Sequence, residues 1–492
     1  MKIAKLICGG LLAAMLLPPA LSPSAGLDQR KILAALGAIT PQEAYALTKI
    51  MASPEFAGRL TGQQGYTAAA LWAAGQFKEW GLKPLSPKEG YLQSYPSPYT
   101  LIDSAEMTLL MPEKPAEGSG GLKEFKLEAG KDFLPLLFSD SGQAEAGLVF
   151  AGWGISAPEL GYDDYAGLEA TGCFVLCFRG TPRPSDNRFQ EYDEHRRRMR
   201  TAQDKGAVGL VYIYPEVSAN PNGEWLAGFL PSEISEKAAD LILKEKGLTV
   251  ARLKEDLASY QRPLSFPLQA RLRAKVEARH FEQGIGANVV GWLEGSDPKL
   301  KSECLVFGAH FDHCGRHLNI LFPGADDNAS GSATVMEIAR AFAALRPKPR
   351  RSVLFVLFGG EEMGLQGSRY FADHLPSPFQ AVTVLFNFDM TGEGDGAWGG
   401  ASAEPDWLKQ AIEEADSQVK ILRGLRVIRR VGVRSSDFAP FFLKGIPCAS
   451  FGSNGPHLAY HQAGDTIYRI NPDIMADIAK LAFLAGCSLA DR

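Results

Sequence analysis

The spacing of apolar residues divides the chain into stretches with different expected structures. Residues 28–90 carry apolar and small residues at helical spacing, most clearly in 66–82, ahead of the stop at Lys83 and Pro84. Residues from about 115 to 275 alternate short apolar runs with glycine and proline turns, which predicts a mainly β region. From about residue 285 the order becomes strand, loop, helix, strand, which is typical of a mostly parallel α/β sheet.

The first residues have the order of an export signal. Lys2 and Lys5 precede the apolar run 6–17, and prolines and small residues follow it up to Gly26. The run is shorter than the roughly 20 residues that a membrane-spanning helix needs, and no later segment offers such a run. We therefore expect an exported protein, periplasmic or extracellular, that loses residues 1–25 and keeps no stable membrane span.

Composition excludes several classes of protein. The 492 residues are 46% hydrophobic and carry a formal net charge of −5, so the chain is neither disordered nor suited to nucleic acid. The basic run Arg196, Arg197, Arg198 and Arg200 is either an anion patch or, more typically, a solvated helix face. Cysteines are too sparse for a disulfide scaffold, and no CxxC pair suggests a thiolate metal site.

Histidine and acidic residues follow the ends of the predicted strands in the last stretch. They come after the apolar runs 304–309, 353–358, 382–388 and 446–451. In chain order these residues are His310, Asp312, Glu361, Glu362, Asp389, His457 and His461. Because ligands of open parallel sheets bind beyond the carboxyl ends of the strands, we expect the segments to converge on one crevice.

A further acidic segment lies between the first two of these strands. Small residues in 323–331 permit a tight turn that carries Asp326 and Asp327 and opens a helix over 332–345. Imidazoles with several carboxylates suit zinc or a related divalent cation with an open coordination position. Three carboxylates and two imidazoles exceed the needs of one catalytic zinc, whereas two metals about 3.5–4 Å apart, sharing one carboxylate, would use them all.

Ordered motifs in this region resemble a known family. They are GAHFDHCG, PGADDNASG, FGGEEMGLQGSRYF, FNFDM and YHQAGDT, with a weaker extension to SPEFAGRLTGQQGY at 53–66. Together they resemble the co-catalytic zinc aminopeptidases of the bacterial leucyl aminopeptidase type. The resemblance implies a zinc-exopeptidase α/β/α sandwich on a mixed, mostly parallel sheet.

The middle region looks like a protease-associated domain inserted into the peptidase domain. It contains FAGWGI, GYDDYAGL and a KGAVGLVYI run. The expected division is therefore an N-terminal part of the peptidase domain at 26–114, an inserted domain at 115–278 and the catalytic domain at 279–492. We expect the inserted domain to shape the mouth of the crevice and to restrict large substrates.

The resemblance also assigns metal ligands residue by residue. It implies that Asp326 bridges two zinc ions, that His310 and Asp389 complete one site, and that Glu362 and His461 complete the other. Co²⁺ or Mn²⁺ would be substitutes for Zn²⁺. Taken singly, such carboxylates are as often helix caps or turn formers; their order as a set favours the metal site.

Other residues receive roles next to the metals. Glu361 would be the general base, Asp312 would orient the His310 imidazole, and Tyr460 would donate to the developing oxyanion. The resemblance gives His313, His317 and His457 no ligand role.

The sequence departs from the family pattern at two positions. Phe438 stands where the family often has a histidine after Asp437, and this departure concerns the substrate pocket rather than the metals. Cys314 stands where leucine is commoner and is expected to be a small apolar filler.

These observations predict an aminopeptidase that acts on peptides with a free N-terminus. Another zinc exopeptidase such as a carboxypeptidase, or a single-zinc glutaminyl cyclase, would share most of the ligands. A non-catalytic binding homologue would be expected to lose ligands, and none is missing here. The sequence fixes neither the side-chain preference nor the oligomeric state.

Overall fold

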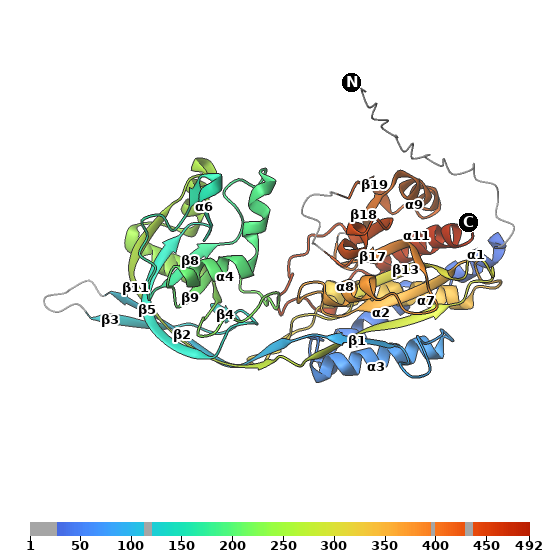
Figure 1. Ribbon diagram of the computed structural model, residues 1–492, viewed down its shortest axis with the longest axis horizontal. Coiled ribbons are helices and arrows are strands. Elements are labelled where there is room, and N and C mark those ends of the chain that lie inside the picture. Colours follow the sequence, from blue (N-terminus) through green and yellow to red (C-terminus); the bar gives the residue numbers. More distant parts are fainter. Residues whose placement is uncertain (1–26, 113–120, 395–398, 429–435) are drawn as a thin grey trace, which may run out of the picture.

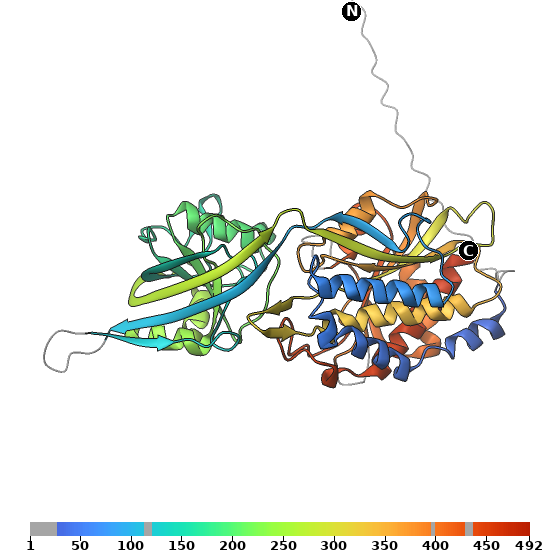
Figure 2. The same cartoon turned by 90° about the horizontal axis from the view of Figure 1, so that it is seen from below.

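The computed structural model describes residues 27–112, 121–394, 399–428 and 436–492. The expected export signal lies outside these residues, so export stays a prediction. No helix within the described ranges is long and apolar enough to cross a membrane. The chain forms two lobes, and each lobe is built on its own sheet. The chain passes between the lobes twice, next to two long strands (Figures 1 and 2).

The first lobe contains a mixed eight-stranded sheet. Its order is β1 (Leu92–Pro96), β12 (Ile285–Leu293), β16 (Ser352–Phe358), β13 (Glu303–His310), β17 (Ala381–Phe388), β20 (Cys448–Ser453), β18 (Gly399–Glu404) and β19 (Leu422–Arg426). The central strands β16, β13, β17 and β20 are parallel, and β1, β12 and β18 pair antiparallel. The predicted α/β fold on a mostly parallel sheet is confirmed.

Helices cover both faces of this sheet, so its central strands are mostly apolar and are buried along most of their length. One face packs on α1 (Gln29–Leu36), α2 (Pro41–Met51), α3 (Gln64–Glu79), α7 (Gly331–Ala344), α9 (Asp406–Val419) and α11 (Pro472–Ala490). The other packs on α8 (Gln366–Asp373) and α10 (Phe438–Leu443). Phe307 of β13 stacks on Phe386 of β17 at 5.0 Å between ring centroids. Burying each such ring contributes about 1.5–3 kcal/mol.

The second lobe, here called the inserted lobe, contains another eight-stranded sheet. Its order is β3 (Leu122–Lys126), β2 (Tyr99–Pro112), β11 (Ser265–Phe281), β5 (Gly142–Ala151), β8 (Phe174–Phe178), β9 (Gly209–Tyr214), β10 (Ser232–Ser235) and β4 (Phe133–Pro135). The helices α4 (His195–Asp204), α5 (Glu236–Leu243) and α6 (Val250–Tyr260) accompany it.

The inserted lobe begins earlier than the expected boundary at residue 115. The strand β2 pairs with β11 along most of its length. Its first residue, Tyr99, lies opposite Phe281, the last residue of β11. This long-range pairing decides the boundary, and no local feature of 99–112 announces it. That the lobe is a protease-associated domain stays a prediction.

The basic run on α4 is not a uniformly solvated helix face. The side chain of Arg198 is 1% exposed and pairs with Asp193, with 2.6 Å between Nη1 and Oδ1. Its Nε also donates to the Trp153 carbonyl at 2.8 Å. The neighbouring Arg196 is 36% exposed and lies near the junction of the two lobes.

Arg59 joins the N-terminal region to the loops that follow the central strands. It is fully buried, and it donates to the carbonyls of Phe311 at 2.6 Å, Met51 at 2.6 Å, Pro323 at 2.8 Å and Gly324 at 2.8 Å. Burial lowers the pKa of Arg59 to about 10, and nearby carboxylates, Asp465 first, oppose that fall. The side chain therefore stays charged at neutral pH and fixes both segments.

Replacing Arg59 with methionine should destabilise the first lobe strongly. The change leaves those four carbonyls buried without their donor, at about 1–3 kcal/mol for each group that finds no substitute, so we expect a loss of at least about 3 kcal/mol. Urea unfolding measures the loss, and the exposed Arg188→Met is the control. A loss no greater than that of the control would contradict this role.

Candidate metal centre

The predicted ligand segments meet at the carboxyl ends of the central strands. His310 is the last residue of β13, Asp389 directly follows β17, and Glu362 lies in the turn after β16. His461 lies in the loop after β20, and its φ of 57° places it in the left-handed region. The turn Ala325–Ser330, between β15 (Ile320–Phe322) and α7, supplies an aspartate.

Three of these side chains form a first group around His310. Its Nε2 lies 3.3 Å from Oδ1 of Asp327 and 3.4 Å from Oδ1 of Asp389. The other Asp389 oxygen accepts from the Ser436 hydroxyl at 2.5 Å. These three atoms thus converge at spacings suited to ligands of a common cation.

A second group forms around His461. Its Nε2 lies 2.9 Å from Oε2 of Glu362 and 3.2 Å from Oδ2 of Asp327. Asp327 therefore turns one oxygen to each group, which is the geometry of a bridging carboxylate. Its side chain is 3% exposed, so this carboxylate is screened from solvent.

The carboxylate that lies between the two groups is that of Asp327, whereas the sequence resemblance assigns the bridging role to Asp326. Asp326 Oδ2 lies 2.6 Å from Nδ1 of His457, and its Oδ1 accepts from the main-chain N–H groups of Gly392 and Glu393 at 2.9 and 2.8 Å. All of these partners lie outside the two groups. The side chains of the adjacent aspartates point in different directions at this turn.

Asp465 fixes this turn from a distance. Its two carboxylate oxygens accept from the main-chain N–H groups of Asp326 and Asp327, at 2.8 and 3.0 Å. Asp465 is 2% exposed, and burial raises its pKa to about 7. These bonds hold the aspartate pair in place before any ligand binds.

The donor set fits divalent cations. Asp327 Oδ2 and His461 Nε2 are buried, and among the described residues neither makes a hydrogen bond, although they lie 3.2 Å apart. Atoms of His310, Asp327 and Glu362 lie within 4.8 Å of one another, as do atoms of His313, Cys314, Glu362 and His461. A cation in each group would satisfy atoms that are otherwise costly to bury, and imidazoles with carboxylates suit zinc.

The adjacent glutamates have opposite electrostatic environments. Burial raises the pKa of Glu361 well above its usual value, despite the nearby His310 imidazole. Burial acts on Glu362 in the same direction, yet the imidazoles of His461 and His313 bring the pKa of Glu362 below its usual value. Glu362 is thus held as a carboxylate, whereas Glu361 is able to carry a proton. The different environments thus suit the different roles expected of the two residues, a ligand for Glu362 and proton transfer for Glu361.

The structure refines the expected role of Asp312. The Nδ1 of His310 lies 3.3 Å from the main-chain oxygen of Asp312 and 3.8 Å from its carboxylate. The Oδ1 atom of Asp312 accepts a hydrogen bond from the Glu361 N–H at 3.2 Å. Asp312 therefore contacts His310 mainly through its main chain, while its carboxylate supports the turn that carries Glu361.

Tyr460 lies directly against His461 of the second group. Its ring stacks on that of His461, with 3.9 Å between centroids and 20° between planes, and the side chain is 52% exposed. Its role as an oxyanion donor stays a prediction.

His313 is a residue whose contribution the sequence analysis missed. Its Nδ1 lies 2.8 Å from Oε1 of Glu362, and its ring meets that of His461 edge to face at 5.5 Å. An ionised carboxylate only accepts hydrogen bonds, so Nδ1 carries the proton and donates it to Glu362. The position of His313 directly after Asp312, beyond the end of a buried strand, was the available signal.

The inserted lobe contacts the centre directly. The main-chain N–H of Ala219 donates to the His461 carbonyl at 2.8 Å, and the Cys314 thiol donates to the Ala219 carbonyl at 3.4 Å. Cys314 is buried among apolar residues of the inserted lobe, which agrees with its expected role as a filler. Within the described ranges, all cysteines are free thiols.

Comparison with known proteins decides the family. The sequence model of peptidase family M28 matches residues 288–485. A probable leucine aminopeptidase of Trichophyton verrucosum is 31% identical over 319 residues, which cover 57% of this chain and 86% of the relative. The chain belongs to peptidase family M28. The resemblance to zinc exopeptidases drawn from the motifs is thereby confirmed.

Further similarities extend across both lobes. Aminopeptidase YwaD of Bacillus subtilis is 25% identical over 378 residues, covering 73% of this chain and 70% of the relative. The solved structure of BSAP, a zinc aminopeptidase from Bacillus subtilis, superposes with a TM-score of 0.59 at 20% identity. It covers 91% of this chain and 94% of its own, so the two proteins share the fold of both lobes.

A matched pair of substitutions tests the bridging position. Asp327→Asn should leave less than one tightly bound metal ion per chain, because one change weakens both ligand groups, whereas Asp326→Asn should keep the wild-type metal content. Elemental analysis of dialysed protein measures the content. Loss in the Asp326 variant with retention in the Asp327 variant would restore the sequence-based assignment.

A second pair tests the His313 contact. His313→Ala should weaken metal binding by about 10- to 100-fold, the range for partners that orient a ligand. His313→Asn should be milder, because its amide places a donor near the position of Nδ1. Competition with a chelator gives the affinities. Equal weakening in both variants would show that the hydrogen bond to Glu362 does not matter.

Proposed function

We propose that this chain is an aminopeptidase that uses two divalent cations, in the first instance zinc, to hydrolyse the first peptide bond of peptides with a free N-terminus. The observation that carries the proposal is the Asp327 carboxylate, which turns one oxygen to each of two ligand groups. One group would hold a cation through His310 and Asp389, and the other through Glu362 and His461. Zinc is further supported by the solved Bacillus subtilis relative, which is a zinc aminopeptidase.

When bound, the cations would lower the pKa of a water molecule towards 7 and polarise the scissile carbonyl. The protein supplies the proton transfer. Glu361 lies beside Glu362 but is not held by an imidazole hydrogen bond in the described structure, and burial raises its pKa, which suits a group that accepts and returns a proton. Glu361 would take the proton of the attacking water and pass it to the leaving nitrogen.

The names of the relatives favour removal of N-terminal residues over the alternatives. The similar proteins from Bacillus subtilis and Trichophyton verrucosum are described as aminopeptidases. A carboxypeptidase or a glutaminyl cyclase would need a comparable observation in its favour, and the described residues provide none. Export to the periplasm or the exterior rests on the order of residues 1–25 alone.

Metal content and the release of free amino acids test the proposal together. Two zinc-like ions per chain are expected, with cleavage of an unblocked peptide and none of its N-acetylated form. Glu361→Gln should keep both metals and lose at least about 100-fold in kcat, as general-base removal typically does. One ion per chain, or full activity of Glu361→Gln, would refute the two-metal mechanism.

A further inference from the structure

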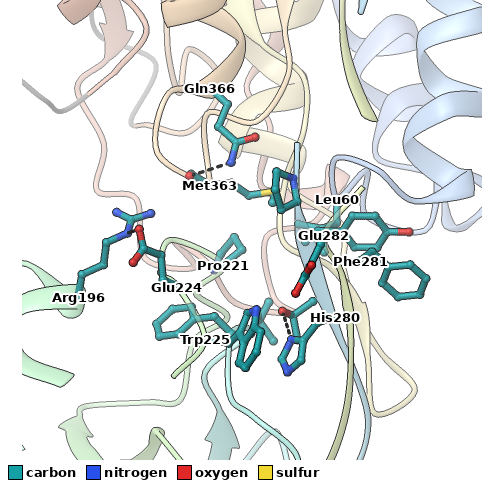
Figure 3. Close-up of a pocket in the computed structure, with 16 residues that line it drawn as sticks. Leu60, Arg196, Pro221, Glu224, Trp225, His280, Phe281, Glu282, Met363 and Gln366 are labelled. Carbon is teal, nitrogen blue, oxygen red and sulfur yellow. Dashed lines mark hydrogen bonds and ion pairs between the residues drawn. The ribbon is translucent and has the colours of Figure 1, made fainter. Parts of the chain in front are cut away.

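A cavity of about 400 Å³ lies between the two lobes, next to the turn that carries the glutamates (Figure 3). Leu60, Met363 and Gln366 line it from the first lobe, and Phe138, Arg196 and Trp225 line it from the inserted lobe. The volume is near the small end of the roughly 300–1,000 Å³ usual for small-molecule pockets. It therefore suits a short peptide and excludes a folded segment.

The cavity adjoins the catalytic turn. Met363 directly follows Glu362, and the Gly364 N–H closes the turn on the Glu361 carbonyl at 2.8 Å. A Cβ added to Gly364 would lie 3.8 Å from Nη2 of Arg196. The guanidinium of Arg196 thus reaches across the junction of the lobes and lies against the turn that carries Glu361.

Arg196 keeps donors available for a ligand. Its Nη1 donates to Asn222 Oδ1 at 3.4 Å, and its Nε lies 3.4 Å from Glu224 Oε1. The Nε is buried, and within the described part of the chain it makes no hydrogen bond. Glu224 is shared, because its other oxygen binds Arg200 at 2.8 Å. A guanidinium has five N–H donors. The two long contacts of Arg196 therefore leave some of its N–H groups available to a ligand.

Trp225 provides a rigid apolar surface in the same cavity. Its side chain is 39% exposed, and its ring stacks on that of His280 with 4.3 Å between centroids and 12° between planes. His280 is itself fixed, because its ring nitrogens contact Thr100 Oγ1 at 2.8 Å and Asp140 Oδ1 at 3.0 Å. An aromatic face held in this way suits an apolar or aromatic side chain of a ligand.

The acidic groups of the cavity do not cancel Arg196. Glu224 is held by two arginines, so the three side chains together keep a positive charge. Glu282 is solvent-exposed and lies across the cavity from Arg196 in Figure 3. A carboxylate beside the catalytic turn would therefore meet a cation first.

The direction of the substrate follows from the chemistry. The general base returns its proton to the leaving nitrogen, so the leaving part of the peptide lies on the side of Glu361. The cavity begins at Met363, two residues further along the same turn.

We infer that this cavity is the subsite for the leaving part of the substrate: Arg196 binds its C-terminal carboxylate, and Trp225 contacts the side chain that follows the cleaved bond. The inference rests on the proposed function and narrows its substrate class to short peptides with a free C-terminus and an apolar residue after the cleaved bond.

Leucine release from Leu-Phe and from its C-terminal amide tests the carboxylate contact, because the two substrates differ only in that charge. Wild type should show the lower KM for the free acid. Arg196→Met should raise the KM for the free acid about 10- to 100-fold, the value of a charge-assisted contact, with kcat little changed and with the KM for the amide within about twofold. Loss of uniform binding has this signature.

Arg197→Met is the matched control, since Arg197 follows Arg196 on α4 but pairs with Glu191 at 2.8 Å and does not line the cavity. It should leave the preference for the free acid intact. Trp225→Ala should remove the preference for Leu-Phe over Leu-Ala while keeping that for the free acid. Far-UV circular dichroism and melting temperature verify that each variant is folded.

Equal KM values for acid and amide in wild type, or a parallel loss on both substrates in Arg196→Met, would overturn the inference while leaving the proposed function standing. Absence of leucine release from every unblocked peptide would instead overturn the proposed function.

Discussion

The buried guanidinium of Arg59 is the constraint on which the metal centre depends. Its donors hold the carbonyls of Phe311, Pro323 and Gly324, which flank the candidate ligand His310 on one loop and Asp327 on the next. Because the guanidinium is planar and its donors have fixed directions, it holds these loops in a fixed position relative to each other. Buried carboxylates would otherwise repel one another and spread the loops, so the positive charge also stabilises the acidic cluster electrostatically.

Much of the first lobe could be predicted because its central strands are apolar on both faces. The runs read at 304–309, 353–358 and 382–388 differ by one residue or none from the ends of β13, β16 and β17. A sheet covered by helices on both sides leaves no alternative burial for such runs. Ligands placed directly after them were therefore brought together as expected, since parallel strands end at one edge.

What the sequence could not supply depends on contacts between distant residues. The choice between Asp326 and Asp327 depends on the backbone of the turn, which is fixed by hydrogen bonds from both main-chain N–H groups to Asp465, far along the chain. The start of the inserted lobe at Tyr99 likewise depends on pairing with β11. The burial of Arg198 shows the same limit, because a run of arginines looks solvated until its carboxylate partner is known.

The pairing of Tyr99 with Phe281 places the entry and exit of the inserted lobe side by side. Only short links join these strands to β1, which ends at Pro96, and to β12, which begins at Ile285. Because the two ends of the inserted segment lie next to each other, inserting it costs the first lobe little loop-closure entropy. The lobe is therefore an insertion with adjacent ends, and besides its two links to the first lobe it is tied to the candidate metal centre through Ala219, whose N–H donates to the His461 carbonyl at 2.8 Å.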